Sequence, residues 1–320
     1  MTQTKTLSSF ALDIRKGLTH DPKYISSKYF YDAMGSKIFR QIMALPEYYL
    51  TRSEYEILEN HLSEILAAFQ EHQDTFSLIE MGPGDGSKTK ILIEHFMKQK
   101  VWFDYIPIDI SQAELKGLTN DLKIAHPQLK VAPSHGDFFE ILHQLNLHSH
   151  KTKIILFMGS TIGNFTHTES LAFLKHIRKN LSTGDKLFIG FDLKKEPKII
   201  RKAYNDSQGI TRNFNLNLLH RINRELDGHF NIDSFSHEPS YNPLTGEAKS
   251  YLVSHKAQSV KIGAFNTTIH FKKWEAIYTE LSQKFDEEMI LELAEKSGFS
   301  VDINFYDSHT YFTNSLWRAI

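Results

Sequence analysis

The chain has 320 residues, with 37 lysines and arginines against 38 aspartates and glutamates, which leaves a net charge of −1. Because it has no basic surplus, it lacks the electrostatic field that holds a polyanion, so no nucleic-acid partner is expected. The sequence contains no cysteine, which excludes disulfides and thiolate metal sites.

No segment approaches the roughly 18 consecutive apolar residues of a membrane helix. Residues 1–16 also lack an apolar stretch of signal-peptide length. We therefore expect a cytoplasmic protein with no membrane partner, and we expect it to act as a monomer. The 17 histidines lack the helical spacing and the carboxylate neighbours of a catalytic zinc site, so no metal is expected.

The first two thirds of the chain alternate between amphipathic helical segments and short apolar runs. A helix is predicted over Tyr55–Phe69. The strands predicted after it are 76–81, Val101–Ile110, Leu129–Ala132, Lys153–Met158 and Lys186–Phe191. The helices predicted between them cover Lys88–Lys100, 111–125 and about 171–181. Such alternation, with buried strands, is typical of an α/β fold with a doubly wound, mostly parallel sheet.

The pattern changes near Pro197. Residues from there to about Asn242 are predicted to be helical. Alternating segments then predict an inserted β-rich subdomain with strands Lys249–His255, Val260–Phe265, Thr267–Lys273 and Trp274–Leu281. A helix over Glu287–Lys296 follows, and the strands Val301–Tyr306 and Tyr311–Trp317 are expected to join the main sheet as an antiparallel edge pair.

The first predicted strand runs into three closely spaced glycines, Gly82, Gly84 and Gly86, and a helix begins at once after them. Glycines let the backbone approach a ligand closely, and the start of a helix offers unpaired N–H groups, so an adenosine-containing cofactor is expected here. Asp109, at the end of the next strand, suits the hydroxyls of a ribose. Asp137 and the backbone N–H of Phe138 suit an adenine ring.

Five sequence segments, in collinear order, indicate which cofactor the chain binds. They are 29–36, 45–54, 159–164, 203–206 and 279–285. Together they resemble the histidine Nα-methyltransferase family of ergothioneine biosynthesis, over nearly the whole chain from Lys23 on. The resemblance implies a Rossmann-like class I methyltransferase that transfers methyl groups from S-adenosylmethionine to the α-amino nitrogen of L-histidine, giving the betaine hercynine.

The resemblance also implies a division of the chain. Residues 1–54 are expected to be an N-terminal helical segment that contributes to the substrate site. Residues 55–195 and 286–320 are expected to form the domain that binds S-adenosylmethionine. Residues 196–285 are expected to be the inserted substrate-recognition subdomain.

Residue by residue, the matching positions imply two sets of ligand contacts. The residues expected to bind the cofactor are Tyr31, Gly82, Lys88, Asp109, Asp137 and Phe138. The residues expected to bind the amino acid are Tyr48, Gly159, Asn164, Tyr204, Ser250, Glu280 and Ser282. Within the second set, Asn164 and Tyr204 are expected to hold the carboxylate, and Glu280 and Ser282 to contact the imidazole. Tyr31 is expected to be catalytic, as a hydrogen-bonding group that positions the amine.

The chain departs from the family pattern at Ser250, where those enzymes carry a methionine. A smaller polar side chain there keeps two alternatives open, a different free amino acid as substrate or methylation of an imidazole nitrogen. A non-catalytic cofactor-binding protein and a nicotinamide oxidoreductase are further alternatives. The complete set of substrate residues argues against the first of these, and Asp137 with Phe138 argues against the second.

Overall fold

A computed structural model describes residues 7–71, 75–148 and 151–320. The described residues form two compact units. Unit 1 contains the residues up to Tyr49 together with Lys195–Gln283, and unit 2 contains Leu50–Lys194 together with Lys284–Ile320. Among the described residues, no helix is both long enough and apolar enough to cross a membrane.

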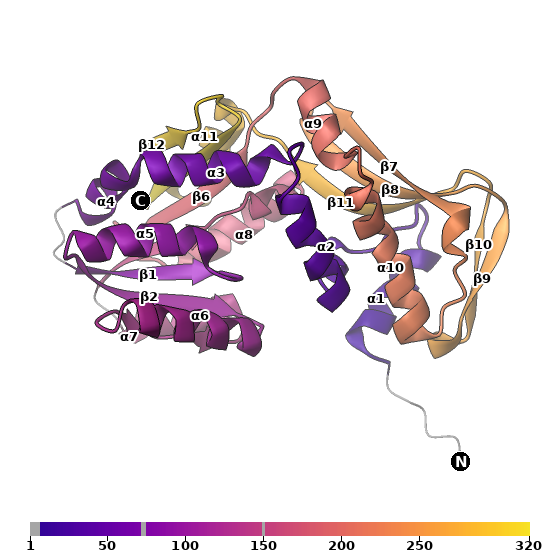
Figure 1. The fold of residues 1–320 in the computed structure, drawn as a ribbon, viewed down its shortest axis with the longest axis horizontal. Coiled ribbons are helices and arrows are strands. Elements are labelled where there is room, and N and C mark those ends of the chain that lie inside the picture. The colour runs from indigo at the N-terminus through magenta and orange to yellow at the C-terminus, as the bar shows by residue number, and fades with distance from the viewer. Residues whose placement is uncertain (1–6, 72–74, 149–150) are drawn as a thin grey trace, which may run out of the picture. The chain divides into compact units, whose positions relative to one another are not determined.

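Unit 2 is built on one mixed sheet with the strand order β12-β13-β6-β5-β1-β2-β3, and β4 also pairs with β2 (Figure 1). The strands are β1 (Thr75–Met81), β2 (Trp102–Asp109), β3 (Lys130–Val131), β4 (Ser134–His135), β5 (Thr152–Phe157), β6 (Lys186–Asp192), β12 (Phe299–Tyr306) and β13 (Phe312–Ala319). All pairs from β6 to β3 are parallel, whereas β13 pairs antiparallel with both β6 and β12. The predicted α/β fold with a mostly parallel sheet and an antiparallel edge pair is confirmed.

Helices cover both faces of this sheet because successive strand side chains point to opposite faces. In β1, Leu78 belongs to one buried cluster and Ile79 to another. The first cluster contains residues of α3 (Tyr49–Asn60), α4 (Leu62–Gln70), α5 (Ser87–Lys98) and α6 (Gln112–Ala125). The second contains residues of α7 (Phe138–His148), α8 (His167–Lys179) and α11 (Glu287–Ser297). The sheet is therefore doubly wound, as predicted.

One predicted helix is wrong as a continuous element. The segment Tyr55–Phe69 belongs to two helices, α3 and α4, which are separated at His61. His61 has φ −115° and ψ 18°, outside the α-helical range, and its ring nitrogen Nδ1 lies 2.8 Å from Glu64 in the first turn of α4. Because the apolar side chains keep helical spacing across the break, periodicity alone does not reveal it.

Unit 1 contains a sheet of order β11-β8-β7 and a ribbon formed by β10 and β9. Its strands are β7 (Phe235–Asn242), β8 (Glu247–Ser254), β9 (Gln258–Ile262), β10 (Thr267–Phe271) and β11 (Ala276–Gln283). Its helices are α1 (Ser9–Thr19), α2 (Ala33–Met43), α9 (Pro197–Tyr204) and α10 (Ile210–Leu226), with short 3₁₀ turns η1 (Ser27–Phe30), η3 (Ile232–Ser234) and η4 (Gly263–Phe265). A single buried cluster joins α1, α2 and α10 to the strands, and in it the rings of Phe30 and Phe214 stack at 4.5 Å.

The prediction that residues 197–242 are helical throughout is wrong at its end, because Phe235–Asn242 is the strand β7, antiparallel to β8. Phe235 and His237 alternate as buried residues, which is the period of a strand. Pro239 lacks an N–H, but β7 lies at an edge of its sheet, where proline is tolerated. The predicted strand over Val260–Phe265 also ends early, at Ile262, where η4 begins.

Candidate functional site

The glycine loop follows β1 in unit 2, at the carboxyl end of the central parallel strands. Gly82, Gly84 and Gly86 have φ angles of +61°, +58° and +66°, a region that L side chains rarely adopt. A Cβ atom added at Gly82 or Gly84 would meet no protein atom within 4 Å. The space beside the loop is therefore open to a ligand, and α5 begins directly after it, with Gly86 as its N-cap.

The sheet topology places this loop where a ligand is expected. The chain moves from β1 to β2 on one side and returns through β5 and β6 on the other, so strand order reverses between β1 and β5. In open α/β sheets, ligands bind outside the carboxyl ends of the strands at such a switch point. Gly82 lies just after β1, and Gly159 lies just after β5.

Two aspartates extend the same edge of the sheet. Asp109 ends β2, and its Oδ1 accepts a hydrogen bond from the backbone N–H of Ser111 at 2.8 Å. Asp137 precedes α7, and its Oδ1 accepts from the N–H groups of Phe139 and Glu140 at 2.9 and 3.1 Å. Each carboxylate is thus oriented by the backbone through Oδ1, while no partner of Oδ2 is seen among the described residues. Both carboxylates are hydrogen-bond acceptors, which fits the hydroxyls and the amino group of an adenosine, because these groups donate.

The turn after β5 contains Gly159 and the 3₁₀ turn η2 (Thr161–Asn164). Gly159 has φ +78° and Ser160 has φ +56°, so the chain reverses direction through two left-handed residues. The hydroxyl oxygen of Ser160 accepts from the N–H of Asp192 at 3.0 Å, which ties the turn to the end of β6. Asn164 is exposed at the end of η2.

Lys88 lies in the first turn of α5, where its charge opposes the positive end of the helix dipole. The structure supplies the compensating charge, because the Lys88 ammonium forms an ion pair with Glu54 of α3. The side chain of Glu54 is 1% exposed, and its carboxylate also accepts from the N–H of Gly159 at 2.9 and 3.1 Å. Glu54 therefore joins a predicted cofactor residue to a predicted substrate residue.

A second buried carboxylate lies beneath the glycine loop. Glu80 of β1 accepts hydrogen bonds from the hydroxyls of Thr89 and Tyr105. Burial raises the pKa of Glu80 to about 7, although the two hydrogen bonds and the nearby Lys88 act in the opposite direction.

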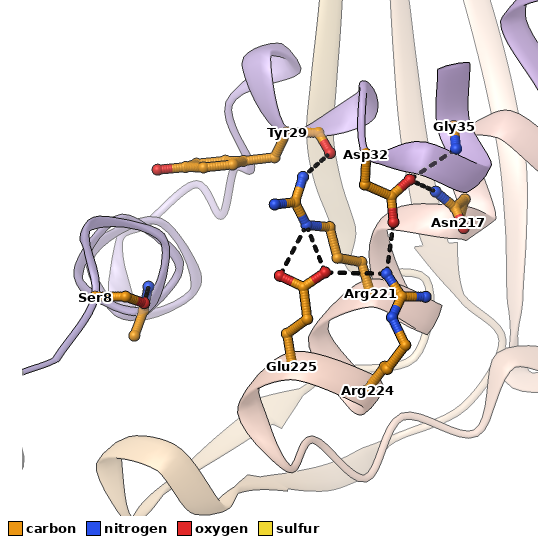
Figure 2. A network of polar contacts seen from close by, with 9 residues as sticks. Ser8, Tyr29, Asp32, Gly35, Asn217, Arg221, Arg224 and Glu225 are labelled. Atoms are coloured by element: carbon orange, nitrogen blue, oxygen red, sulfur yellow. Dashed lines mark hydrogen bonds and ion pairs between the residues drawn. The ribbon is translucent and has the colours of Figure 1, made fainter. Parts of the chain in front are cut away.

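In unit 1, Tyr31 lies between η1 and α2, and a polar network holds this segment against α10 (Figure 2). Asp32 caps α2 by accepting from the N–H of Gly35 at 2.7 Å, and it also accepts from Asn217 Nδ2 at 2.9 Å. Arg224 contacts the other carboxylate oxygen at 2.5 Å. Although burial opposes ionisation, these hydrogen bonds lower the pKa of Asp32.

The Tyr31 ring packs edge-on against Phe39 and Phe214, with centroid distances of 5.3 and 5.7 Å. The residue is 48% exposed, so water reaches one side of the ring while protein atoms crowd the other. Desolvation by those atoms, followed by the charges of Glu280 and Tyr204, raises the pKa of Tyr31. Tyr31 is therefore a neutral phenol at physiological pH, suited to hydrogen bonding and not to acting as a base.

The structure brings Tyr204 and Ser282 together. Tyr204 is the last residue of α9 and is buried, and its hydroxyl donates to Ser282 Oγ of β11 at 2.6 Å. Sequence reasoning assigned these residues to opposite ends of the substrate. Because they share a hydrogen bond, they form one polar surface inside unit 1.

Ser250 and Glu280 form a second pair. They are direct partners on the neighbouring strands β8 and β11, and the Ser250 hydroxyl donates to Glu280 Oε2 at 3.3 Å. The register shifts between Tyr278 and Glu280. Beyond this shift, Glu280 and Ser282 occupy alternate positions, so both side chains point to the same face of β11. Ser250, predicted to line the substrate site, therefore contacts the residue predicted to recognise the imidazole.

Tyr48, the remaining predicted substrate residue, is half-buried at the end of the N-terminal part of unit 1, and its ring packs edge-on against Phe39 at 6.3 Å. The predicted site residues of unit 1 are thus Tyr31, Tyr48, Tyr204, Ser250, Glu280 and Ser282. Those of unit 2 are Gly82, Lys88, Asp109, Asp137, Phe138, Gly159 and Asn164.

Sequence reasoning did not identify Asp32 or Glu54. Asp32 carries a recognisable signal, since an aspartate immediately before an amphipathic helix is a typical N-cap. Glu54 carries none, because Gly159 and Asn314, two of its partners, lie 105 and 260 residues further along the chain.

Glu56, Asp307 and His309 place potential metal ligands within 4.8 Å of one another, but backbone N–H groups already bind both carboxylates. The expectation of no metal stays a prediction.

A doubly wound sheet with a glycine loop at its switch point, followed by aspartates at the next strand ends, defines an α/β protein that binds an adenosine-containing cofactor. A family model described as "Histidine-specific methyltransferase, SAM-dependent" matches residues 10–319. The chain belongs to this family of S-adenosylmethionine-dependent methyltransferases, as the resemblance predicted.

The histidine N-alpha-methyltransferase of Mycolicibacterium smegmatis is 37% identical over 284 residues, which cover 88% of this chain and 87% of that protein. Ergothioneine biosynthesis protein 1 of Schizosaccharomyces pombe is 28% identical over 290 residues, which cover 89% of this chain and 37% of that protein. A solved magnesium protoporphyrin IX methyltransferase from Synechocystis, with bound S-adenosylhomocysteine, aligns with a TM-score of 0.48 at 12% identity, covering 92% of this chain and 98% of that one.

Proposed function

We propose that this enzyme trimethylates the α-amino group of L-histidine to hercynine, with S-adenosylmethionine as methyl donor. The observation that carries the proposal is the polar surface of unit 1, in which Glu280 and Ser282 share one face of β11 and Tyr204 bonds to Ser282. A carboxylate and a hydroxyl suit an imidazole, which presents a donor and an acceptor when neutral and two donors when charged.

S-adenosylmethionine supplies a methyl group activated by attachment to a sulfonium. We propose that Gly82, Lys88, Asp109, Asp137 and Phe138 of unit 2 bind it, with Tyr31 of unit 1 as a further contact. The open space beside Gly82 and Gly84 and the backbone-oriented carboxylates of Asp109 and Asp137 support this assignment.

For the amino acid, we propose that Asn164 and Tyr204 hold the carboxylate by an amide N–H and a phenol O–H. Glu280 and Ser282 contact the imidazole, Ser250 lines the site beside Glu280, and Tyr48 and Gly159 complete the contacts. Removing the Glu280 carboxylate leaves a ring N–H without its partner, and such a loss is a strong source of discrimination between substrates.

The chemical difficulty is the proton on the amine. An α-amino group has a pKa of about 8, so it is mostly protonated at neutral pH and must lose a proton before each methyl transfer. Tyr31, whose phenol stays neutral, accepts or donates a hydrogen bond and positions the amine. The proton leaves to solvent, directly or through a water bound at Tyr31.

We also propose that the residues up to position 54 contribute to substrate binding, that 55–195 with 286–320 form the cofactor domain, and that 196–285 form the substrate-recognition subdomain. The enzyme acts as a monomer in the cytoplasm, where free histidine and S-adenosylmethionine are available.

The test is a competition experiment. The purified enzyme is incubated with S-adenosylmethionine and an equimolar mixture of the standard amino acids, and mass spectrometry identifies which of them gains methyl groups. The proposal predicts that histidine is consumed first. Preferential methylation of another amino acid would instead support the alternative substrate class that Ser250 leaves open.

A further inference from the structure

Glu54 is a buried carboxylate that contacts three separate parts of unit 2. It lies on α3, and its side chain is 1% exposed. It pairs with the Lys88 ammonium in the first turn of α5, accepts from the backbone N–H of Gly159 after β5, and accepts from Asn314 Nδ2 of β13 at 3.0 Å. None of these partners is near Glu54 in the sequence.

The sheet is shaped to receive this side chain. Gly190 of β6 is the direct strand partner of Asn314, and a Cβ atom added at Gly190 would lie 2.8 Å from Glu54 Oε1 and 3.0 Å from the Phe312 ring. Any larger residue at position 190 would therefore displace the carboxylate. Glycine is used here because the Glu54 carboxylate approaches the strand closely, and not because the backbone has a positive φ.

Asn314 is fully buried and directs its amide nitrogen to Glu54. Among the described residues, its Oδ1 has no hydrogen-bond partner. A buried acceptor without a partner destabilises the folded protein. The amide nitrogen of Asn314 is therefore the third donor to the Glu54 carboxylate, beside the Lys88 ammonium and the Gly159 N–H.

Lys88 and Gly159 depend on the same carboxylate. A Cβ atom added at Gly159 would lie 3.5 Å from Lys88 Nζ, so the ammonium and the turn are neighbours. Both residues are assigned ligand contacts in the proposed function, Lys88 to the cofactor and Gly159 to the amino acid. The carboxylate holds both at once, and without it the Lys88 charge would oppose the helix dipole uncompensated.

We propose that Glu54 is a positioning residue of the transferase, which fixes the Lys88 ammonium and the Gly159 turn in their ligand-binding arrangement without touching either ligand. This inference rests on the proposed function for the roles of Lys88 and Gly159. The geometry that supports it lies entirely within unit 2.

A double-mutant cycle on cofactor affinity tests the proposal. Glu54→Gln preserves the size of the side chain and removes its charge, and Lys88→Met removes the ammonium. Calorimetry with S-adenosylhomocysteine should show each single variant binding about tenfold or more weakly, the loss expected for a charge-assisted contact. Because Glu54 acts through Lys88, the double variant should bind within about threefold of the weaker single variant.

Glu59→Gln, an exposed change of the same charge on the same helix, is the matched control and should leave the affinity within about twofold of wild type. The Glu54→Gln variant should also raise the KM for histidine, because the Gly159 turn loses its acceptor. If Glu54 only stabilised the fold, the variant would lower the unfolding temperature and leave the KM unchanged. A folded Glu54→Gln protein with wild-type affinity, or losses that add fully in the double variant, would overturn the proposal.

If Glu54→Gln does not fold, the affinity for S-adenosylhomocysteine is measured with Asn314→Ser instead. This variant removes the amide that donates to Glu54 and keeps the ion pair between Glu54 and Lys88. It should weaken S-adenosylhomocysteine binding about threefold, and unchanged affinity would contradict the proposal. Cofactor affinity is measured without any amino acid. A chain that shows the non-additive loss but does not methylate histidine would therefore contradict the proposed function and leave the role of Glu54 intact.

Discussion

The hydroxyl of Tyr204 donates to Ser282 Oγ at 2.6 Å, so the proposed carboxylate site and the proposed imidazole site share a hydrogen bond. A phenol has one proton to donate. If Tyr204 gives that proton to the substrate carboxylate, Ser282 loses a donor and its oxygen becomes available to a ring N–H. Binding at one end of the amino acid would then prepare the other end, which favours a substrate that carries both groups.

The first prediction follows from this pair. Tyr204→Phe should raise the KM for histidine by about tenfold, the loss expected for a hydrogen bond to a charged group, while S-adenosylhomocysteine affinity changes little. Steady-state kinetics and calorimetry measure the two effects. Tyr306→Phe is the matched control, because that phenol bonds to Glu287 in unit 2. Histamine, which lacks the carboxylate, should be a very poor substrate, and efficient methylation of histamine would show that this assignment is wrong.

The second prediction concerns the cofactor. Asp109→Ala should weaken S-adenosylhomocysteine binding by about 1.5–3 kcal/mol, because a charge-assisted hydrogen bond to a ribose hydroxyl is lost. Asp121→Ala removes an exposed carboxylate that pairs with Lys90, and it should leave binding unchanged. Calorimetry measures both variants. If the wild-type protein bound NADH as tightly as S-adenosylhomocysteine or more tightly, the glycine loop would not be a site for S-adenosylmethionine.

The third prediction concerns selectivity. Glu280→Ala should lower histidine turnover by roughly tenfold or more, because a ring N–H loses its partner, while large apolar amino acids such as tryptophan become relatively better substrates. Ser250→Met removes the hydroxyl that bonds to Glu280 and puts a larger apolar side chain in its place. It should preserve or improve the preference for histidine. Competition assays with histidine and tryptophan measure both variants, and an unchanged preference in Glu280→Ala would argue against the proposed imidazole site.

The fourth prediction concerns stability against pH. The pKa of Glu80 is raised to about 7 in the folded protein from an ordinary value of 4.5. The stability that this group contributes is complete below pH 4.5 and is lost as the pH rises to about 7, because the unfolded chain ionises first. The loss amounts to about 3 kcal/mol at 1.36 kcal/mol per pKa unit. Glu80→Gln should remove this slope.

Urea unfolding of the wild-type protein and the Glu80→Gln variant between pH 4.5 and 7.5 measures the effect, because the difference between the two curves isolates one group. Glutamine fits the site, since the hydroxyls of Thr89 and Tyr105 can accept as well as donate. Parallel curves for the two proteins would show that Glu80 does not titrate in this range.

The sequence predicted the parts of the fold that depend on local patterns. The buried strand before Gly82 and the helix after it are recognisable because apolar runs and glycines lie close together in the chain. Phe235–Asn242 was missed, since Pro239 and several polar residues hide an edge strand that pairing with β8 stabilises. The register shift before Glu280 was also not predictable, because it depends on which residue of β8 lies opposite.

The same contrast applies to the site. Asp109 and Asp137 could be identified because they end or follow predicted strands. Glu54 could not, since its role depends on partners from α5, from the turn after β5 and from β13, which only the folded sheet brings together. The contact between Tyr204 and Ser282 is of the same kind, since the two residues are 78 positions apart in the chain.

The proposed reaction is three successive methylations of the α-nitrogen of histidine. The most direct test is to incubate the wild-type enzyme with histidine and excess S-adenosylmethionine, and to locate the methyl groups in the product by fragmentation mass spectrometry. We expect sequential gains that end at three methyl groups, all on the α-nitrogen. Methyl groups on the imidazole ring, or no methylation of histidine while another amino acid is modified, would contradict it.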